Sequence, residues 1–170
     1  MSNNDSQQTH RKPTPLRSGS FTKAEDVFCN RKLISKEIYY ETKHTIVLYN
    51  ARPIVPGHSL IIPKRHVADF TDLGKTEALD MFGVIRRIKP LLLERYRCDS
   101  YTLTAQVGEG AGMTVNHFHM HIVPRRKDDR YGNDDNRIYD RLYGSIGRMS
   151  AKRKWIESEA KALRMQLKSR

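Results

Sequence analysis

Residues 115–126 read VNHFHMHIVPRR, with a histidine at every second position from 117 to 121. Side chains of a β-strand alternate between its two faces, so this pattern predicts a strand over 115–123 with one polar and one apolar face. The polar face carries His117, His119 and His121, spaced at about 7 Å along the strand. The other face carries Phe118, Met120 and Ile122. One strand is therefore expected to serve both the core and an active surface.

Three interpretations of the histidine row remain open at this point. Buried imidazoles need hydrogen-bond partners and titrate near neutral pH, so a row of three is a poor choice for packing alone. The row fits nucleophilic catalysis, in which a neutral imidazole attacks phosphorus and water later displaces it. Zinc binding is a second interpretation, but no acidic residue flanks the row and the ligand set is incomplete. Alternation with bulky apolar residues disfavours the third, ordinary surface histidines.

Strands are predicted on both sides of two breaker-rich loops. Residues 43–50 (KHTIVLYN) are β-branched and aromatic, and 51–57 (ARPIVPG) contain two prolines and a glycine. The run 59–62 then predicts a second strand, antiparallel to the first. Residues 101–106 predict a further strand, followed by the glycine-rich loop 107–112.

Two helices are predicted from apolar residues at three- and four-residue steps. The first spans about 71–95, and Pro90 is expected to kink or divide it. Its apolar face is predicted to hold Leu79, Phe82, Ile85, Ile88 and Leu92. The second spans 150–168 near the C-terminus. Its apolar face is predicted to hold Ile156, Ala160, Leu163 and Leu167, with Trp155 adjacent.

Composition narrows the class of protein. The 170 residues fit one domain, 21–170, with a mobile polar loop at 127–136 and a disordered basic arm at 1–20. A formal net charge of +12 attracts phosphate-bearing partners without separating a nucleotide enzyme from a nucleic-acid binder. Two cysteines are too few for a disulfide framework, and no apolar run is long enough to span a membrane. A cytoplasmic protein is expected, with nuclear localisation or organellar targeting by the arm left open.

A family resemblance rests on several of these segments. Residues 117–123 (HFHMHIV) resemble the signature of the histidine-triad superfamily, and Pro124-Arg125 resembles its fragile-histidine-triad branch, the dinucleoside-polyphosphate hydrolases. The resemblance extends through 48–58 and 159–164 and covers roughly 28–167. It implies an α+β fold with a mainly antiparallel five-stranded sheet, helices on one side, and a sheet extended across a homodimer.

The resemblance also implies roles for individual residues. His119 is the nucleophile, His117 orients it, His121 donates to the α-phosphate, and His58 lies behind the row as a fourth imidazole. Substrate-binding roles are implied for Asn50 at the ribose, for Arg31 near an apolar adenine pocket formed by Phe28, Ile34 and Leu48, and at the phosphates for Gln106, Gly112, Met113, Thr114, Val115 and His121. From the residues alone, Asn50 is more typical of a turn, and His58 after Pro-Gly could also be only a turn residue.

One loop departs from the family pattern. Residues 107–113 read VGEGAGM where the family has Asp-Gly-Pro-Glu-Ala-Gly-Gln. Met113 thus replaces an amide that could contact phosphate with a soft apolar side chain. The nucleophilic step is expected to survive, and the preferred polyphosphate length is what the change puts in question.

The implied activity is hydrolysis of diadenosine polyphosphates, with the triphosphate preferred, to AMP and the remaining nucleotide. No tightly bound metal or cofactor is expected, and a divalent cation, Mg²⁺ or Mn²⁺, would assist with the substrate. One alternative is a nucleoside phosphoramidate or adenylated-conjugate hydrolase, which shares the first half-reaction. An alternative of another class is a basic nucleotide- or RNA-binding signalling protein.

Overall fold

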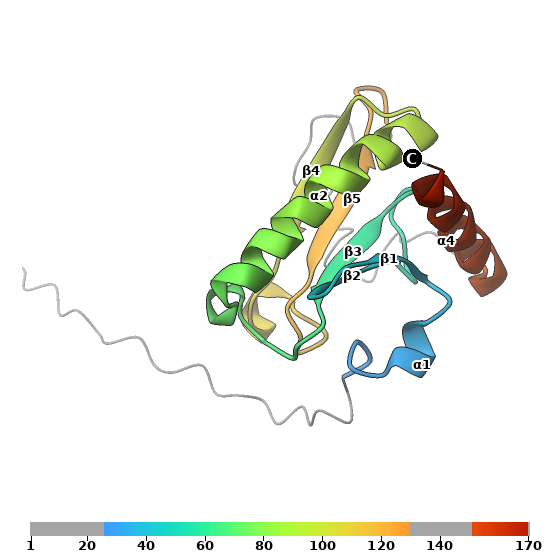
Figure 1. Cartoon of the computed structure of the whole chain (residues 1–170). Helices are drawn as coiled ribbons and strands as arrows, with labels where there is room; N and C mark the ends of the chain where they lie inside the picture. The colour runs from blue at the N-terminus through green and yellow to red at the C-terminus, as the bar shows by residue number, and fades with distance from the viewer. Residues whose placement is uncertain (1–25, 130–150, 170) are drawn as a thin grey trace, which may run out of the picture.

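Five strands build one antiparallel sheet in this computed structural model, which describes residues 26–129 and 151–169 (Figure 1). Neighbouring strands follow the order β1-β2-β3-β5-β4. Their bounds are Ile38–Glu41 (β1), Thr45–Tyr49 (β2), Ser59–Pro63 (β3), Ser100–Ala105 (β4) and Met120–Arg125 (β5). The predicted α+β class with a five-stranded antiparallel sheet is confirmed. The arm at 1–20 and the loop beyond residue 129 lie outside the described residues.

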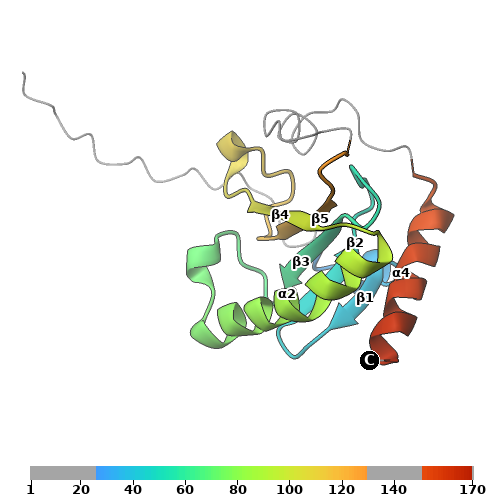
Figure 2. The same cartoon turned by 90° about the horizontal axis from the view of Figure 1, so that it is seen from above.

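Two long helices cover one face of the sheet. Helix α2 (Lys75–Arg95) runs along the strands, and α4 (Arg153–Lys168) lies beside β1 and β2 (Figure 2). The predicted apolar face of α4 is confirmed, because its four residues are all buried. They pack with α2 and with strand residues such as Val47 and Ile61 in one core. A smaller apolar cluster on the opposite face includes Leu48, Leu60 and the short helix α1 (Arg31–Ile34).

The prediction for the apolar face of α2 is wrong for two of its five residues. Leu79 and Phe82 are 61% and 60% exposed. The residues that α2 buries are Met81, Val84, Ile85, Ile88, Leu91 and Leu92. Both sets repeat at helical spacing, so periodicity alone could not decide which stripe would meet the sheet. No helix among the described residues is long and apolar enough to cross a membrane.

Pro90 does not divide α2, which is one continuous helix from Lys75 to Arg95. A proline inside a helix leaves the carbonyl four residues earlier without its usual donor. That carbonyl belongs to Arg86, and both Arg86 and Pro90 lie on the exposed side of the helix. Water can satisfy the carbonyl there, so the helix tolerates the proline.

The strand predicted over 115–123 begins five residues later than expected. Only 120–125 form β5, so His117 and His119 precede the strand. The backbone N–H of His117 donates to the carbonyl of Val115 at 2.7 Å, and that of Phe118 donates to the carbonyl of Val67 at 2.6 Å. The bond from Phe118 holds this backbone against the loop after β3, and pairing of β5 with β3 begins only at Met120. The alternation still holds, since Phe118 and Ile122 belong to the core beneath the helices.

Short connections complete the described chain. A single 3-10 turn, η1 (Phe70–Asp72), precedes α2, and a second, η2 (Glu109–Ala111), lies between β4 and β5. The predicted strands 43–50, 59–62 and 101–106 agree with β2, β3 and β4 to within two residues at each end. The antiparallel pairing of the first two is confirmed, with Tyr49 opposite Ser59 where the loop closes.

Candidate active site

The register of the strands places His121 on the sheet face that the two long helices leave uncovered. Leu48 is paired with Leu60, Leu60 with His121, and His121 with Thr104. Side chains paired directly across strands project from the same face, so these four residues form one row. Leu48 and Leu60 belong to the cluster on the face away from α2 and α4. His121 therefore lies on the face that is available for a ligand.

A cavity of about 660 Å³ opens on this face. Its volume lies within the roughly 300–1,000 Å³ typical of small-molecule sites. Most of the side chains assigned to the site from the sequence line it: Asn50, His58, Gln106, Gly112, Thr114, Val115, His119 and His121. Segments separated by more than 60 residues thus contribute to one site.

One wall of the cavity is apolar, as expected for a base-binding pocket. Phe28, Ile34 and Leu48 all line it. The ring of Phe28 stands edge-on to the imidazole of His119, with ring centroids 5.1 Å apart. The apolar wall therefore ends directly at the predicted nucleophile.

The backbone fixes the tautomer of His119. Its Nδ1 lies 2.7 Å from the carbonyl oxygen of His117, which can only accept, so Nδ1 carries the proton. Nε2 is left with the lone pair that a nucleophile needs. Burial lowers the pKa of His119 below its usual 6.5, which keeps the ring neutral near pH 7.

His58, predicted as a fourth imidazole behind the row, lies beside His121. The backbone N–H of Ile54 donates to Nδ1 of His58 at 3.2 Å, and Nδ2 of Asn50 lies 3.1 Å from Nε2 of the same ring. Nε2 of His58 also lies 2.9 Å from Nδ1 of His121, so the two imidazoles are hydrogen-bonded to each other. The ring of His121 lies against that of His119, with centroids 5.1 Å apart.

The glycine-rich loop lines the cavity at Gly112, but the side chain of Met113, which was predicted to contact the phosphates, does not line it. Gly112 adopts φ +85°, a conformation that favours glycine, and it ends η2. Thr114 and Val115 follow on the cavity wall. Met113, predicted at the phosphate, is buried and is not among the cavity-lining residues. The side chain of Met113 is therefore not part of the cavity wall.

Arg31 is the second predicted site residue that does not line the cavity. Its guanidinium pairs with Glu41 at 2.8 Å on the outer side of β1. The cavity-lining arginines in the described chain are Arg52 and Arg153, which the sequence did not single out. Arg153 begins α4, more than 100 residues from the loop that carries Arg52, so spacing gave no signal for it.

His117 is also absent from the cavity lining. It is buried, and its ring nitrogens contact Asp26 and the carbonyl of Pro63. Its contribution to the site is the backbone carbonyl that accepts the hydrogen bond from Nδ1–H of His119. Sequence reasoning missed the neighbours of His117, namely Asp26, Cys29 and His66, because each lies at least 51 residues before it in the sequence.

Comparisons with known proteins agree with this geometry. A family model described as HIT domain matches residues 31–128. The nitrilase and fragile histidine triad fusion protein NitFhit of Caenorhabditis elegans is 39% identical over 115 residues, which make up 68% of this chain and 26% of that protein. The crystal structure of C. elegans NitFhit matches with a TM-score of 0.61 and 32% identity, over 78% of this chain and 27% of that one.

Two further relatives are named bis(5'-adenosyl)-triphosphatase. The protein of Saccharomyces cerevisiae is 37% identical over 117 residues, 68% of this chain and 55% of that protein. The protein of Dictyostelium discoideum is 37% identical over 123 residues, 72% of this chain and 78% of that protein. The chain thus spans about a quarter of the worm protein and about half of the yeast protein. With a family model matching more than half of its length and its histidines gathered at one cavity, the chain belongs to the histidine-triad (HIT) family.

Proposed function

We propose that this protein hydrolyses dinucleoside polyphosphates, diadenosine triphosphate foremost, through a nucleotidyl-histidine intermediate on His119. The observation that carries the proposal is a buried, neutral imidazole whose Nδ1–H is held by a carbonyl and whose Nε2 keeps a lone pair. It lies at the junction of an apolar wall and a polar, amide-lined end of one cavity. The names of the yeast and Dictyostelium relatives support the same activity.

The reaction would proceed in two displacements. Nε2 of His119 attacks the α-phosphorus, the bond from that phosphorus to the bridging oxygen breaks, and ADP leaves with the oxygen. Water then attacks the same phosphorus, the bond to Nε2 breaks, and AMP is released. The Nδ1–H group of His119 stays hydrogen-bonded to the carbonyl of His117 throughout, while Nε2–H of His121 donates to a phosphoryl oxygen.

A divalent cation would accompany the substrate's phosphates. Mg²⁺ and Mn²⁺ prefer oxygen ligands, which the polyphosphate supplies itself. The reactive end of the cavity offers imidazoles and amides, such as His119, His121 and Gln106. The cation's role in this proposal is to screen phosphate charge while His119 attacks.

Product analysis in ¹⁸O-labelled water tests the activity. With diadenosine triphosphate we expect AMP and ADP in equal amounts, with the label only in AMP, because water attacks the phosphorus bound to His119. An alkaline quench should leave a nucleotidylated peptide that contains His119, detected by mass spectrometry. Label in ADP, or turnover of adenosine phosphoramidate alone, would overturn the proposal; the second result would identify the phosphoramidate hydrolase instead.

We also propose that the protein acts as a homodimer. Leu79 and Phe82 expose apolar surface on α2, and the edge strand β4 exposes Tyr101 and Leu103. Charging α2 in a Leu79→Glu, Phe82→Glu double variant should convert a dimer to a monomer in multi-angle light scattering. Leu33→Glu, which charges another exposed leucine, on α1, is the control. A wild-type monomer, or a dimer that survives the double variant, would contradict this proposal.

A further inference from the structure

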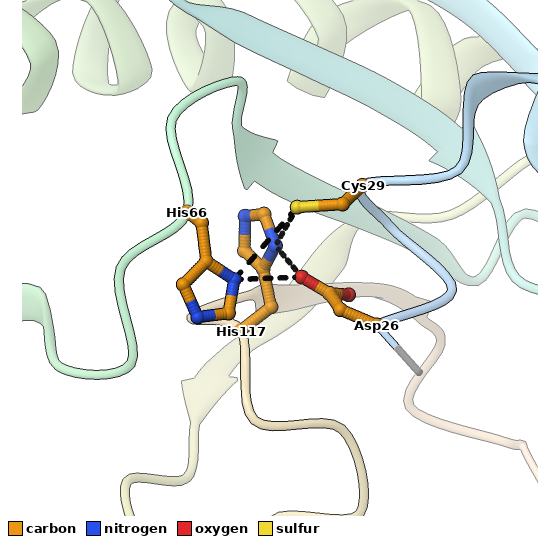
Figure 3. A group of neighbouring side chains, drawn as sticks. All are labelled: Asp26, Cys29, His66 and His117. Carbon is orange, nitrogen blue, oxygen red and sulfur yellow. Dashed lines mark hydrogen bonds and ion pairs between the residues drawn. The ribbon is translucent and has the colours of Figure 1, made fainter. Parts of the chain in front are cut away.

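Four side chains converge behind the active-site cavity: Asp26, Cys29, His66 and His117 (Figure 3). We call them the Asp26–His117 cluster. One ligand atom from each, namely a carboxylate oxygen, a thiol sulfur and two imidazole nitrogens, lies within 4.8 Å of all the others. The residues come from the segment before α1, the loop after β3 and the approach to β5. Three segments of the chain therefore meet at one point.

The hydrogen bonds of His117 direct one nitrogen to the cluster. Its Nε2 lies 2.9 Å from the carbonyl of Pro63, so Nε2 carries a proton. Its Nδ1 faces Oδ2 of Asp26 at 2.6 Å and Sγ of Cys29 at 3.8 Å. A metal-binding histidine typically donates its other ring N–H to a carbonyl or carboxylate. His117 has this arrangement, with Nδ1 as the ligand atom.

Asp26 and His66 present their ligand atoms to the same point. Oδ1 of Asp26 is held by the backbone N–H of Phe28 at 2.8 Å. Its Oδ2 lies 2.8 Å from Nδ1 of His66, which in turn lies 3.7 Å from Sγ of Cys29.

The distances approach those of a tetrahedral zinc site. Zinc bonds of about 2.3 Å to sulfur and about 2.0–2.2 Å to nitrogen and oxygen give sulfur–nitrogen edges of about 3.6 Å and oxygen–nitrogen edges of about 3.4 Å. The two sulfur–nitrogen distances, 3.7 and 3.8 Å, match. The oxygen–nitrogen distances, 2.6 and 2.8 Å, are those of hydrogen bonds and would lengthen when a cation replaces the shared protons.

We propose that the Asp26–His117 cluster binds one zinc ion in a closed, four-ligand site. Thiolate and imidazole ligands favour zinc over Mg²⁺ and Ca²⁺, which take all-oxygen shells. Binding would displace the thiol proton of Cys29 and any proton on the two Nδ1 atoms. This departs from the expectation of no tightly bound metal, which rested on the incomplete ligand set at the histidine row and on the small number of cysteines. The ligands are spread from residue 26 to residue 117, so their spacing gave no zinc signature.

The site would position the catalytic groups and take no part in the reaction itself. Phe28 lies between two of its ligands and lines the cavity against His119. The carbonyl of His117 holds Nδ1–H of His119. An ion bound to Asp26, Cys29 and His117 would therefore fix both the apolar wall and the orientation of the nucleophile. We expect its loss to raise the KM for the dinucleotide severalfold.

Metal binding is tested directly, with no substrate, on the full chain. We expect about one zinc per chain by mass spectrometry after zinc loading and desalting under reducing conditions. Replacing zinc with Co²⁺ should give tetrahedral d–d bands and a thiolate-to-cobalt charge-transfer band. Cys29→Ser should remove the charge-transfer band, and His66→Gln, at a half-buried ligand, should weaken zinc binding at least about tenfold.

Cys98→Ser is the matched control, because Cys98 is the other cysteine and lies outside the cluster. It should keep both the zinc stoichiometry and the cobalt spectrum. Substoichiometric zinc in the loaded wild type, or a cobalt spectrum unchanged by Cys29→Ser, would overturn the proposal. These readouts involve no hydrolysis, so they stand or fall independently of the proposed enzymatic activity.

Discussion

Replacing His119 with asparagine should lower kcat for diadenosine triphosphate by about 10³-fold or more, equivalent to at least about 4 kcal/mol of activation free energy. The amide NH₂ of asparagine can still donate to the carbonyl of His117, which His119 Nδ1 contacts at 2.7 Å. The fold should therefore persist. The side chain has no lone-pair nitrogen to attack phosphorus, so the covalent step is lost.

Two measurements separate a lost nucleophile from a damaged site. Calorimetry should give a Kd for diadenosine triphosphate on His119→Asn within a fewfold of the wild-type value, because the apolar wall and Gln106 are unchanged. His44→Asn changes a histidine away from the cavity and should retain wild-type kcat. If His119→Asn kept substantial turnover, another residue would have to be the nucleophile.

The alternation of the histidine row predicted the active face because the signal is local. Residues two apart in an extended segment share a face whether or not they are in a ladder, so His119 and His121 lie together although β5 begins between them. The Pro-Gly turn likewise delivered His58 to the same face, where it bonds to His121. Short-range geometry was sufficient for these residues.

The missed features all depend on contacts between distant segments. The stripe of α2 that meets the sheet was decided by packing against β2, β3 and β5, so periodicity favoured Leu79 and Phe82 wrongly. The start of β5 was decided by the bond from Phe118 to Val67. The ring of His117 contacts Asp26, which lies 91 residues away in the sequence. No pattern within one segment reports such partners.

Gly57→Ala should destabilise the protein by about 3 kcal/mol, combining left-handed backbone strain with overpacking. Gly57 has φ +86°, and an added Cβ would lie 2.5 Å and 2.6 Å from ring atoms of Tyr96 and 2.9 Å from Pro124. The Tyr96 ring cannot rotate away without breaking the hydrogen bond that its hydroxyl donates to Glu159 of α4 at 2.6 Å. The turn that precedes His58 therefore packs closely against Tyr96 and Pro124. Urea unfolding measures the loss.

Gly83→Ala is the matched control, since Gly83 lies on the exposed side of α2 and an added Cβ there meets nothing within 4 Å. Alanine is the better helix former, so this variant should gain about 0.5–1 kcal/mol. The two identical substitutions are thus expected to have opposite signs. Gly57 also donates its backbone N–H to the hydroxyl of Tyr49 at 2.7 Å, so strain there should displace His58 and reduce activity even in the folded fraction. Equal stability of the two variants would show that the turn at Gly57 accommodates an added Cβ without strain.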